Sequence, residues 1–348
     1  MKIGSLRLLL IGLVLSFLSL AAICPGQMRY RVFDSGADFD PVRVSQAGMI
    51  AGQAVGSFAF DRIGGLSQIL PFPPSSQIWA EDVNAAGTVV GGAYQGSTLL
   101  PFIWDRTNGT RALADFNVNS SYAFGINDAG DVVGRYFPDM GFAQAYLWRP
   151  GQGWVDLPSK YGGWCGAYKI NNSREVIGYS QIDQDHSTQV IWRPDGTIVD
   201  LGNMAPQYQN FATDINNNGY VSGVTYGPLG NVGYLWNPNG ETYTPIWNPY
   251  SPGSYTTAVG LNDQNNLVGY LYISGVGWRA YIRYANGTMK LLNEMLDSTS
   301  QGWDIRYAYD INNKGQISAV GYKNGQRRGV LLQPIKDRTP ISIGGIGR

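Results

Sequence analysis

The sequence predicts an all-β protein, a β-propeller with seven four-stranded blades. Three observations support this prediction. A motif recurs seven times at intervals of 39 to 50 residues, and two further motifs recur at matching intervals. Asn-Gly or Asp-Gly pairs separate short apolar segments. A period of roughly 40–45 residues with four strands is typical of a propeller blade. The apolar residues alternate with a period of two, as in strands, and not with the period of a helix.

The first motif is an apolar residue followed by Asn, a turn and a second apolar segment, and its clearest copy is Ile126–Gly134 (INDAGDVVG). We expect the first strand of each blade to end here, with the Asn side chain opening the turn through a backbone hydrogen bond. Arg174 and Asn265 replace the turn Gly in two copies. Because Arg tolerates positive φ poorly, we expect a different turn in the fourth repeat. The copies begin at Val44, Val83, Ile126, Ile170, Ile215, Leu261 and Ile311.

The second motif is an apolar triplet such as Tyr146-Leu147-Trp148, and it predicts the third strand of each blade. Its last position is Trp in four consecutive repeats. Identical positions in successive blades favour packing between neighbouring blades over a sugar-stacking role. These residues are Trp104, Trp148, Trp192 and Trp236. Tryptophans outside this frame are better candidates for an exposed ligand face, namely Trp154, Trp164, Trp247, Trp278 and Trp303.

The third motif is a glycine turn that precedes the fourth strand. It occurs as Asn108-Gly109 and Asp195-Gly196, for example, and predicts a type I′ hairpin turn, which needs positive φ at both central positions. The strand that follows is short, as in 197–201. Residues 289–296 (MKLLNEML) indicate a helical turn, which we expect to be an elaboration of the sixth repeat.

The two ends of the chain predict a closed ring. Residues 30–34 resemble a fourth strand, whereas the last repeat, from Asp304 to about Gln333, supplies only three. We therefore expect the N-terminal strand to complete the last blade, which hides sheet edges that would otherwise template aggregation. This gives one propeller over 28–334 and a C-terminal tail over 335–348. Six or eight blades are the alternatives, together with an open β-solenoid, against which the hairpin turns argue.

Residues 1–26 predict a secretory signal peptide. Lys2 and Arg7 precede the apolar run 8–20, and small residues follow it. The run is short for a hydrocarbon core of about 30 Å, which disfavours a retained anchor. Lipid attachment at Cys24 is a further alternative, although Ile23 stands where a lipobox has a small residue. We expect a secreted protein, extracellular or periplasmic, without a transmembrane span after cleavage.

Composition narrows the classes of partner and cofactor. Charged residues make up 14% of the chain, with 25 basic and 25 acidic residues and no basic run, so nucleic acid is not expected as a partner. The two cysteines, Cys24 and Cys165, give neither a disulfide scaffold nor zinc spacing, and we expect Cys165 to be a buried apolar residue.

Few residues offer chemistry for catalysis or for a cofactor. The single histidine, His186, lies in a polar segment without a nucleophile motif, and we expect it to be solvated. No Gly-rich phosphate loop follows a strand and opens a helix. Residues 214–219 (DINNNG) match the start of a calcium loop, but Thr225 occupies the twelfth position. A turn built from Asn and Asp side chains is therefore preferred; no cofactor is expected, and Ca²⁺ is the one left open.

The position before each first motif varies among the repeats. It holds Arg43, Asp82, Gly125, Lys169, Asp214, Gly260 and Asp310. If the first strand of each blade is innermost, these residues line the central channel. Five of them are the candidate binding residues for a polar ligand or cation: Arg43, Asp82, Lys169, Asp214 and Asp310. A solvated channel lining without a ligand is the alternative.

The repeated pattern Ile-Asn-Asn-x-Gly-x-Val-x-Gly, then aromatic-Leu-Trp, then Asn-Gly-Thr resembles the HAF-type probable extracellular repeat family. The resemblance covers nearly all of the chain after residue 26 and is most specific in the middle five repeats. It implies a bacterial, exported, β-propeller-like protein without an established activity. Some members carry a C-terminal Pro-Glu-Pro sorting tail with a hydrophobic span, which 336–348 lacks.

The preferred function is that of an exported, non-catalytic binding or interaction protein, expected to be a monomer. Its ligand would be a protein, peptide or glycan bound by the loops of one propeller face. One alternative is a lyase or glycosidase that uses the carboxylates of Asp82, Asp214 and Asp310 at the channel mouth. The other is a structural protein of a cell surface or matrix.

Overall fold

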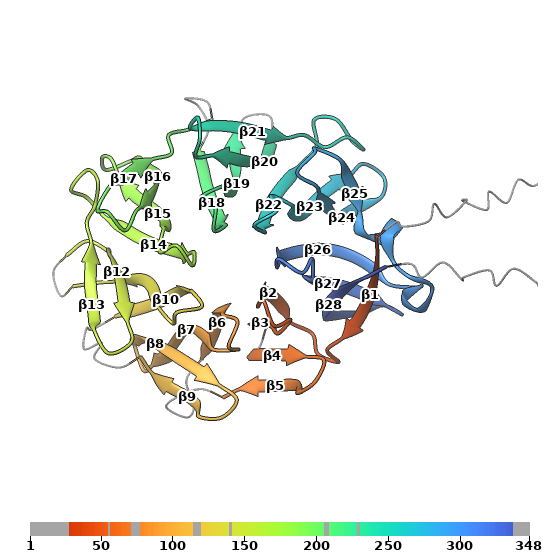
Figure 1. The fold of residues 1–348 in the computed structure, drawn as a ribbon, viewed down its shortest axis with the longest axis horizontal. Coiled ribbons are helices and arrows are strands. Elements are labelled where there is room, and N and C mark those ends of the chain that lie inside the picture. Colours follow the sequence, from red (N-terminus) through yellow and green to blue (C-terminus); the bar gives the residue numbers. More distant parts are fainter. Residues whose placement is uncertain are drawn as a thin grey trace, which may run out of the picture.

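The structure is a ring of seven four-stranded antiparallel sheets around a central channel (Figure 1). It is a computed structural model that describes residues 28–54, 56–70, 77–113, 120–138, 141–204, 209–227 and 230–336. The predicted signal peptide, 1–26, lies outside the described residues. The predicted seven-bladed propeller is confirmed. No helix in these ranges is long and apolar enough to cross a membrane.

Six blades are built from four consecutive strands, numbered outward from the channel. Blade 1 has β2 (Asp40–Val44), β3 (Ile50–Gln53), β4 (Ser57–Asp61) and β5 (Gly65–Ile69). Blade 2 has β6 (Ile78–Val83), β7 (Val89–Gln95), β8 (Thr98–Asp105) and β9 (Gly109–Ala112). Blade 3 has β10 (Ser121–Ile126), β11 (Val132–Tyr136), β12 (Gln144–Arg149) and β13 (Gly153–Leu157).

The next three blades repeat this order. Blade 4 has β14 (Cys165–Ile170), β15 (Val176–Gln181), β16 (Ser187–Trp192) and β17 (Ile198–Asp200). Blade 5 has β18 (Gln209–Ile215), β19 (Val221–Gly227), β20 (Gly230–Asn237) and β21 (Thr242–Ile246). Blade 6 has β22 (Thr256–Leu261), β23 (Leu267–Ile273), β24 (Gly277–Arg283) and β25 (Met289–Leu291). Two 3₁₀ helices follow it, η1 (Leu292–Met295) and η2 (Ser298–Ser300). The helical turn expected over 289–296 is confined to η1, because Met289–Leu291 form strand β25.

Blade 7 joins the two ends of the chain, as predicted. It contains β26 (Asp304–Ile311), β27 (Ile317–Lys323) and β28 (Gln326–Lys336), and its outer strand is β1 (Met28–Asp34). The pairing of β1 with β28 is antiparallel and continuous from Met28 opposite Lys336 to Asp34 opposite Val330. Strand β28 thus extends two residues past the predicted boundary at residue 334.

Among the described residues, the hydrophobic core forms seven clusters, one between each pair of neighbouring blades. The repeated tryptophans belong to these clusters: Trp104, Trp148, Trp192 and Trp236 are all buried. Their predicted role in packing between blades is confirmed. Because each cluster needs both neighbouring blades, the ring stabilises its blades jointly.

A bulge in the first strand explains the Gly that ends the first motif. In blade 3, the register between β10 and β11 shifts between Ala123 and Gly125. The bulge brings the backbone of β10 so close to Gly134 that a Cβ there would lie 1.9 Å from the carbonyl oxygen of Tyr122. Only Gly fits such an approach.

Two turn predictions were wrong. In the fourth repeat, Arg174 adopts the left-handed conformation (φ 64°) and keeps the turn of the other repeats. Its Nε donates to Asp131 Oδ2 of the preceding blade at 2.7 Å, which holds the side chain in place. The hairpins before the fourth strand are not type I′, because Gly109 and Gly196 have positive φ whereas the residues before them do not. At Gly196, a three-residue turn over 194–196 with a left-handed Gly accounts for this.

Candidate functional site

The two faces of the propeller differ in chemistry. Turns between strands 1 and 2 and between strands 3 and 4 of each blade lie on one face, which we call the asparagine face. The connections between strands 2 and 3, and from strand 4 to the next blade, lie on the other, which we call the aromatic face. The first strands line the channel between the two faces, as predicted (Figure 1).

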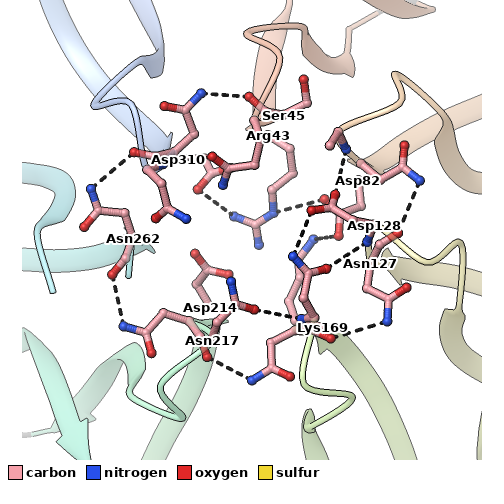
Figure 2. A pocket seen from close by; sticks show the side chains of 18 of the residues that line it. Arg43, Ser45, Asp82, Asn127, Asp128, Lys169, Asp214, Asn217, Asn262 and Asp310 are labelled. Carbon is pink, nitrogen blue, oxygen red and sulfur yellow. Dashed lines mark hydrogen bonds and ion pairs between the residues drawn. The ribbon is translucent and has the colours of Figure 1, made fainter. Parts of the chain in front are cut away.

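A circle of asparagines ties the blades together on the asparagine face (Figure 2). The Nδ2 of each repeated Asn donates to the backbone carbonyl of its equivalent in the next blade, at 2.8–3.4 Å. The Oδ1 of Asn84, for example, accepts from the backbone of Ala86, which is the predicted role in the turn. The bond to the next blade was not predicted. The donors are Asn84, Asn127, Asn171, Asn216, Asn262 and Asn312.

A second circle runs one residue further along each turn. The backbone N–H donates to the side-chain oxygen at the same position in the next blade, at 2.8–3.1 Å. The accepting residues are Asp128, Asn172, Asn217, Asp263, Asn313 and Gln46.

Both circles are interrupted between blades 1 and 2. Ser45 replaces the Asn of blade 1, and its Oγ accepts from the backbone of Met49. Ala85 takes the acceptor position of blade 2 and has no side-chain oxygen. A groove of about 610 Å³ opens at this seam, lined by Met49, Ile63 and Arg106 among others.

The predicted channel residues meet in one charged cluster (Figure 2). Lys169 Nζ lies 2.9 Å from Asp82 Oδ2. Arg43 lies within 4.0 Å of the carboxylates of Asp82 and Asp310, and its Nη2 donates to the carbonyl of Thr213 across the channel at 3.0 Å. Arg43 therefore spans the channel from blade 1 to blade 5.

The three aspartates of the cluster also connect neighbouring blades. Asp82 accepts from the backbone N–H of Val83 in its own blade and of Ile126 in blade 3. Asp214 does the same toward Leu261, and Asp310 toward Val44. Each carboxylate is thus occupied by two backbone donors, which stabilise its charge.

Burial shapes the ionisation of this cluster. Asp214 keeps some surface toward the channel, yet burial raises its pKa to about 7, with Arg43 opposing and the like charge of Asp310 adding to the shift. Burial also raises the pKa of Asp310 and lowers that of Lys169. The space beside the cluster is small, about 120 Å³. The five candidate residues therefore lie together as predicted, but they mainly bind one another.

The calcium pattern at 214–219 forms a turn. Asn216 Oδ1 accepts from the backbone of Asn218 and Tyr220, both at 3.0 Å, and Asp214 faces the channel. Within the described ranges, no three His, Cys, Asp or Glu side chains are grouped so that they could hold a metal ion.

The aromatic face carries every exposed aromatic side chain of the described residues. All lie at the ends of second strands, at the starts of first strands or in the connections on that face: Tyr94, Phe137, Phe142, Tyr161, Trp164, Phe211, Tyr226, Trp247, Tyr250, Tyr255 and Tyr272. Further inward, half-buried rings line the channel mouth, with centroids of Tyr122 and Phe124 4.5 Å apart and of Phe124 and Tyr168 5.9 Å apart.

The tryptophans predicted for a ligand face fall into two groups. Trp164 and Trp247 are exposed on the aromatic face, and Trp278 is half-buried there among tyrosines. Trp303 is buried, so its prediction was wrong. Trp154 is half-buried on β13, an outer strand, where it packs against Tyr136.

Tyrosines of the aromatic face were missed by the sequence reasoning, although a signal existed. In six repeats, a Tyr follows the end of the first motif within three residues, where the second strand reaches this face. These residues are Tyr94, Tyr136, Tyr179, Tyr226, Tyr270 and Tyr322.

Comparisons with known proteins support the fold. No family model and no curated protein matches the chain. Among solved structures, an oligogalacturonate lyase in complex with manganese is similar with a TM-score of 0.57 and 10% identity, over 90% of this chain and 97% of that one. Virginiamycin B lyase from Staphylococcus aureus gives 0.54 and 11%, over 88% and 99%. A prolyl endopeptidase gives 0.54 and 8%, over 90% of this chain and 51% of that chain. At these identities, the similarity shows the propeller fold alone.

Proposed function

We propose that this protein is an exported, non-catalytic binding propeller that holds its ligand on the aromatic face. The observation that carries the proposal is the gathering of all eleven exposed aromatic side chains of the described residues on that face. Exposed aromatic side chains combine a large apolar surface with few rotatable bonds, and they are enriched where proteins bind ligands. Export is the part of the proposal that rests on residues 1–26 and on the HAF-type resemblance.

The carboxylates of the charged cluster are already hydrogen-bonded, which favours a ligand site outside the channel. The carboxylates of Asp82, Asp214 and Asp310 each accept one backbone N–H of their own blade and one of the next blade. A general acid or base has to face its substrate, whereas these carboxylates bind backbone N–H groups, and those of Asp82 and Asp310 also lie beside Arg43. Their geometry favours a role in closing the ring.

The test is a ligand screen of the purified protein by thermal shift, with glycans, peptides and Ca²⁺, alongside turnover assays on the same compounds. A ligand that binds only the folded state raises the Tm. We expect a hit whose effect is lost in the triple variant Trp247→Ser, Tyr250→Ser, Tyr255→Ser or in Trp164→Ser, and kept in Ile63→Ser, which alters an exposed residue of the opposite face. Turnover of any compound, or a hit that is lost only in Asp214→Ala, would overturn the proposal. Self-assembly without any ligand would favour a structural protein instead.

A further inference from the structure

Two adjoining hollows on the aromatic face meet at Trp164, between blades 3 and 4. One has a volume of about 470 Å³ and is lined by Phe142, Tyr161 and Trp164 among others. The other has about 210 Å³ and is lined by Trp164, Tyr179 and His186 among others. The larger hollow alone lies within the range of roughly 300–1,000 Å³ that is typical of ligand pockets. We call the two hollows together the Trp164 cleft.

Aromatic rings with large exposed surfaces form the walls of the cleft. Trp164 is 42% exposed, Tyr161 44% and Phe142 61%. The rings of Phe142 and Trp164 lie 5.6 Å apart, and the hydroxyl of Tyr161 donates to Asp200, which fixes the position of that ring. The Tyr161 ring is therefore anchored, and the rings of Phe142 and Trp164 contact each other, without a ligand.

The polar side of the cleft is also organised in advance. Trp164 continues the pairing of β14 with β15, since its carbonyl accepts from the backbone N–H of Gln181 at 2.8 Å and its N–H donates to Gln181 Oε1 at 3.2 Å. In the loop that follows, Asp183 Oδ1 accepts from the backbone of Asp185 and His186 at 2.9 Å. The ring of His186 lies 2.8 Å from the same oxygen.

The lining combines stacking surfaces with uncharged and acidic hydrogen-bonding groups. Gln181, Gln184, Asp183 and Asp185 contribute amides and carboxylates, and no Lys or Arg occurs among the described residues that line either hollow. A pyranose offers a face of C–H groups, which suits the electron-rich face of an aromatic ring, and a rim of hydroxyls, which suits carboxylate and amide oxygens. An acidic lining disfavours anionic sugars.

We propose that the Trp164 cleft is a binding site for a neutral oligosaccharide, with a pyranose stacked on Trp164. This inference rests on the proposed function and specifies its ligand class and location. A proline-rich peptide also stacks on aromatic rings, but proline lacks an N–H and offers the carboxylates of Asp183 and Asp185 no donor. The hydroxyls of a sugar match these groups better.

The test is isothermal titration of the full-length protein with cellohexaose, maltohexaose and chitohexaose, and with oligogalacturonate and decaproline for comparison. We expect a neutral hexasaccharide to bind, Trp164→Ala to weaken binding by roughly tenfold or more, and Trp164→Phe to retain part of the affinity. The matched control is Ile63→Ala, which removes an exposed apolar side chain of the opposite face and should change affinity less than about twofold. Trp247→Ala, on the same face but outside the cleft, tests whether another part of that face contributes to binding.

Each of the other outcomes refutes a specific part of the proposal. Glycan binding that depends on Trp247 and not on Trp164 would refute the cleft but keep the aromatic face as the binding surface. Binding of decaproline or oligogalacturonate alone would refute a neutral sugar as the ligand. If neither these probes nor the wider screen gives a ligand, both the cleft and the proposed function fail. Circular dichroism of each variant confirms that a loss of binding is not a loss of fold.

Discussion

Replacing Asn216 by Ala removes one link of the asparagine circle and should destabilise the whole propeller. The side chain is 2% exposed and makes four hydrogen bonds. Its Nδ2 donates to the carbonyl of Asn262 and to Asn265 Oδ1 in the next blade, and its Oδ1 accepts from the backbone of Asn218 and Tyr220. At about 1 kcal/mol net for each bond, with some partners regaining water, the loss is about 2–4 kcal/mol.

Thermal and urea unfolding of the Asn216→Ala variant measure this loss. For a domain of roughly 300 residues, 2–4 kcal/mol corresponds to a fall in Tm of roughly 3–6 °C. The control is Asn239→Ala, which alters an exposed Asn in the hairpin turn of the same blade and should change stability by less than about 0.5 kcal/mol. If both variants unfold at the same temperature as each other, the asparagine circle does not stabilise the ring and the reasoning fails.

Three further predictions concern other residues at the interfaces between blades. The double substitution Ser45→Asn with Ala85→Asp supplies the donor and acceptor missing at the interrupted seam, and should raise the unfolding free energy by about 1–3 kcal/mol in urea at an unchanged m-value; no gain would contradict it. Because the pKa of Asp214 is raised from 3.8 to about 7 in the folded state, its contribution to stability is present below pH 4 and is lost as the pH rises to 7. Asp214→Asn should therefore flatten the decline in stability over this interval, and an unchanged pH profile would refute the raised pKa. Trp192 Nε1 donates to a backbone carbonyl at 2.8 Å, whereas the buried Nε1 of Trp236 has no acceptor among the described residues, so Trp192→Phe should cost about 1 kcal/mol more than Trp236→Phe in urea unfolding; equal costs would count against this bond.

The fold could be predicted from the sequence because the repeats encode local geometry. Strand period, turn residues and the step of the motifs are all properties of short segments, and seven copies reinforce one another. The closing strand was predictable because the last repeat lacks a fourth strand and 30–34 resembles one. The left-handed Arg174 was not, since its strain is offset by a bond to Asp131 of another blade, which no local pattern reveals.

The sequence predicted where the channel residues lie, but not what they bind. The residues before each first motif do line the channel, because the first strand of every blade is innermost. Whether Asp82 binds a ligand or the next blade depends on the approach of Ile126 across a blade interface, and sequence spacing carries no such distance. In the same way, the exposure of Trp164 and the burial of Trp303 depend on loops whose course the repeats do not specify.

The pairing of β1 with β28 has a consequence for the order in which the protein matures. Strand β1 is synthesised before all seven innermost strands, yet its partner is the last strand described. Contacts between segments so distant in sequence form slowly. Until β28 is available, the unpaired edges of β1 can pair with other strands of the same or another chain. The ring can therefore close only when the chain is made through β28. A product that stops before β28 leaves β1 unpaired and blade 7 incomplete.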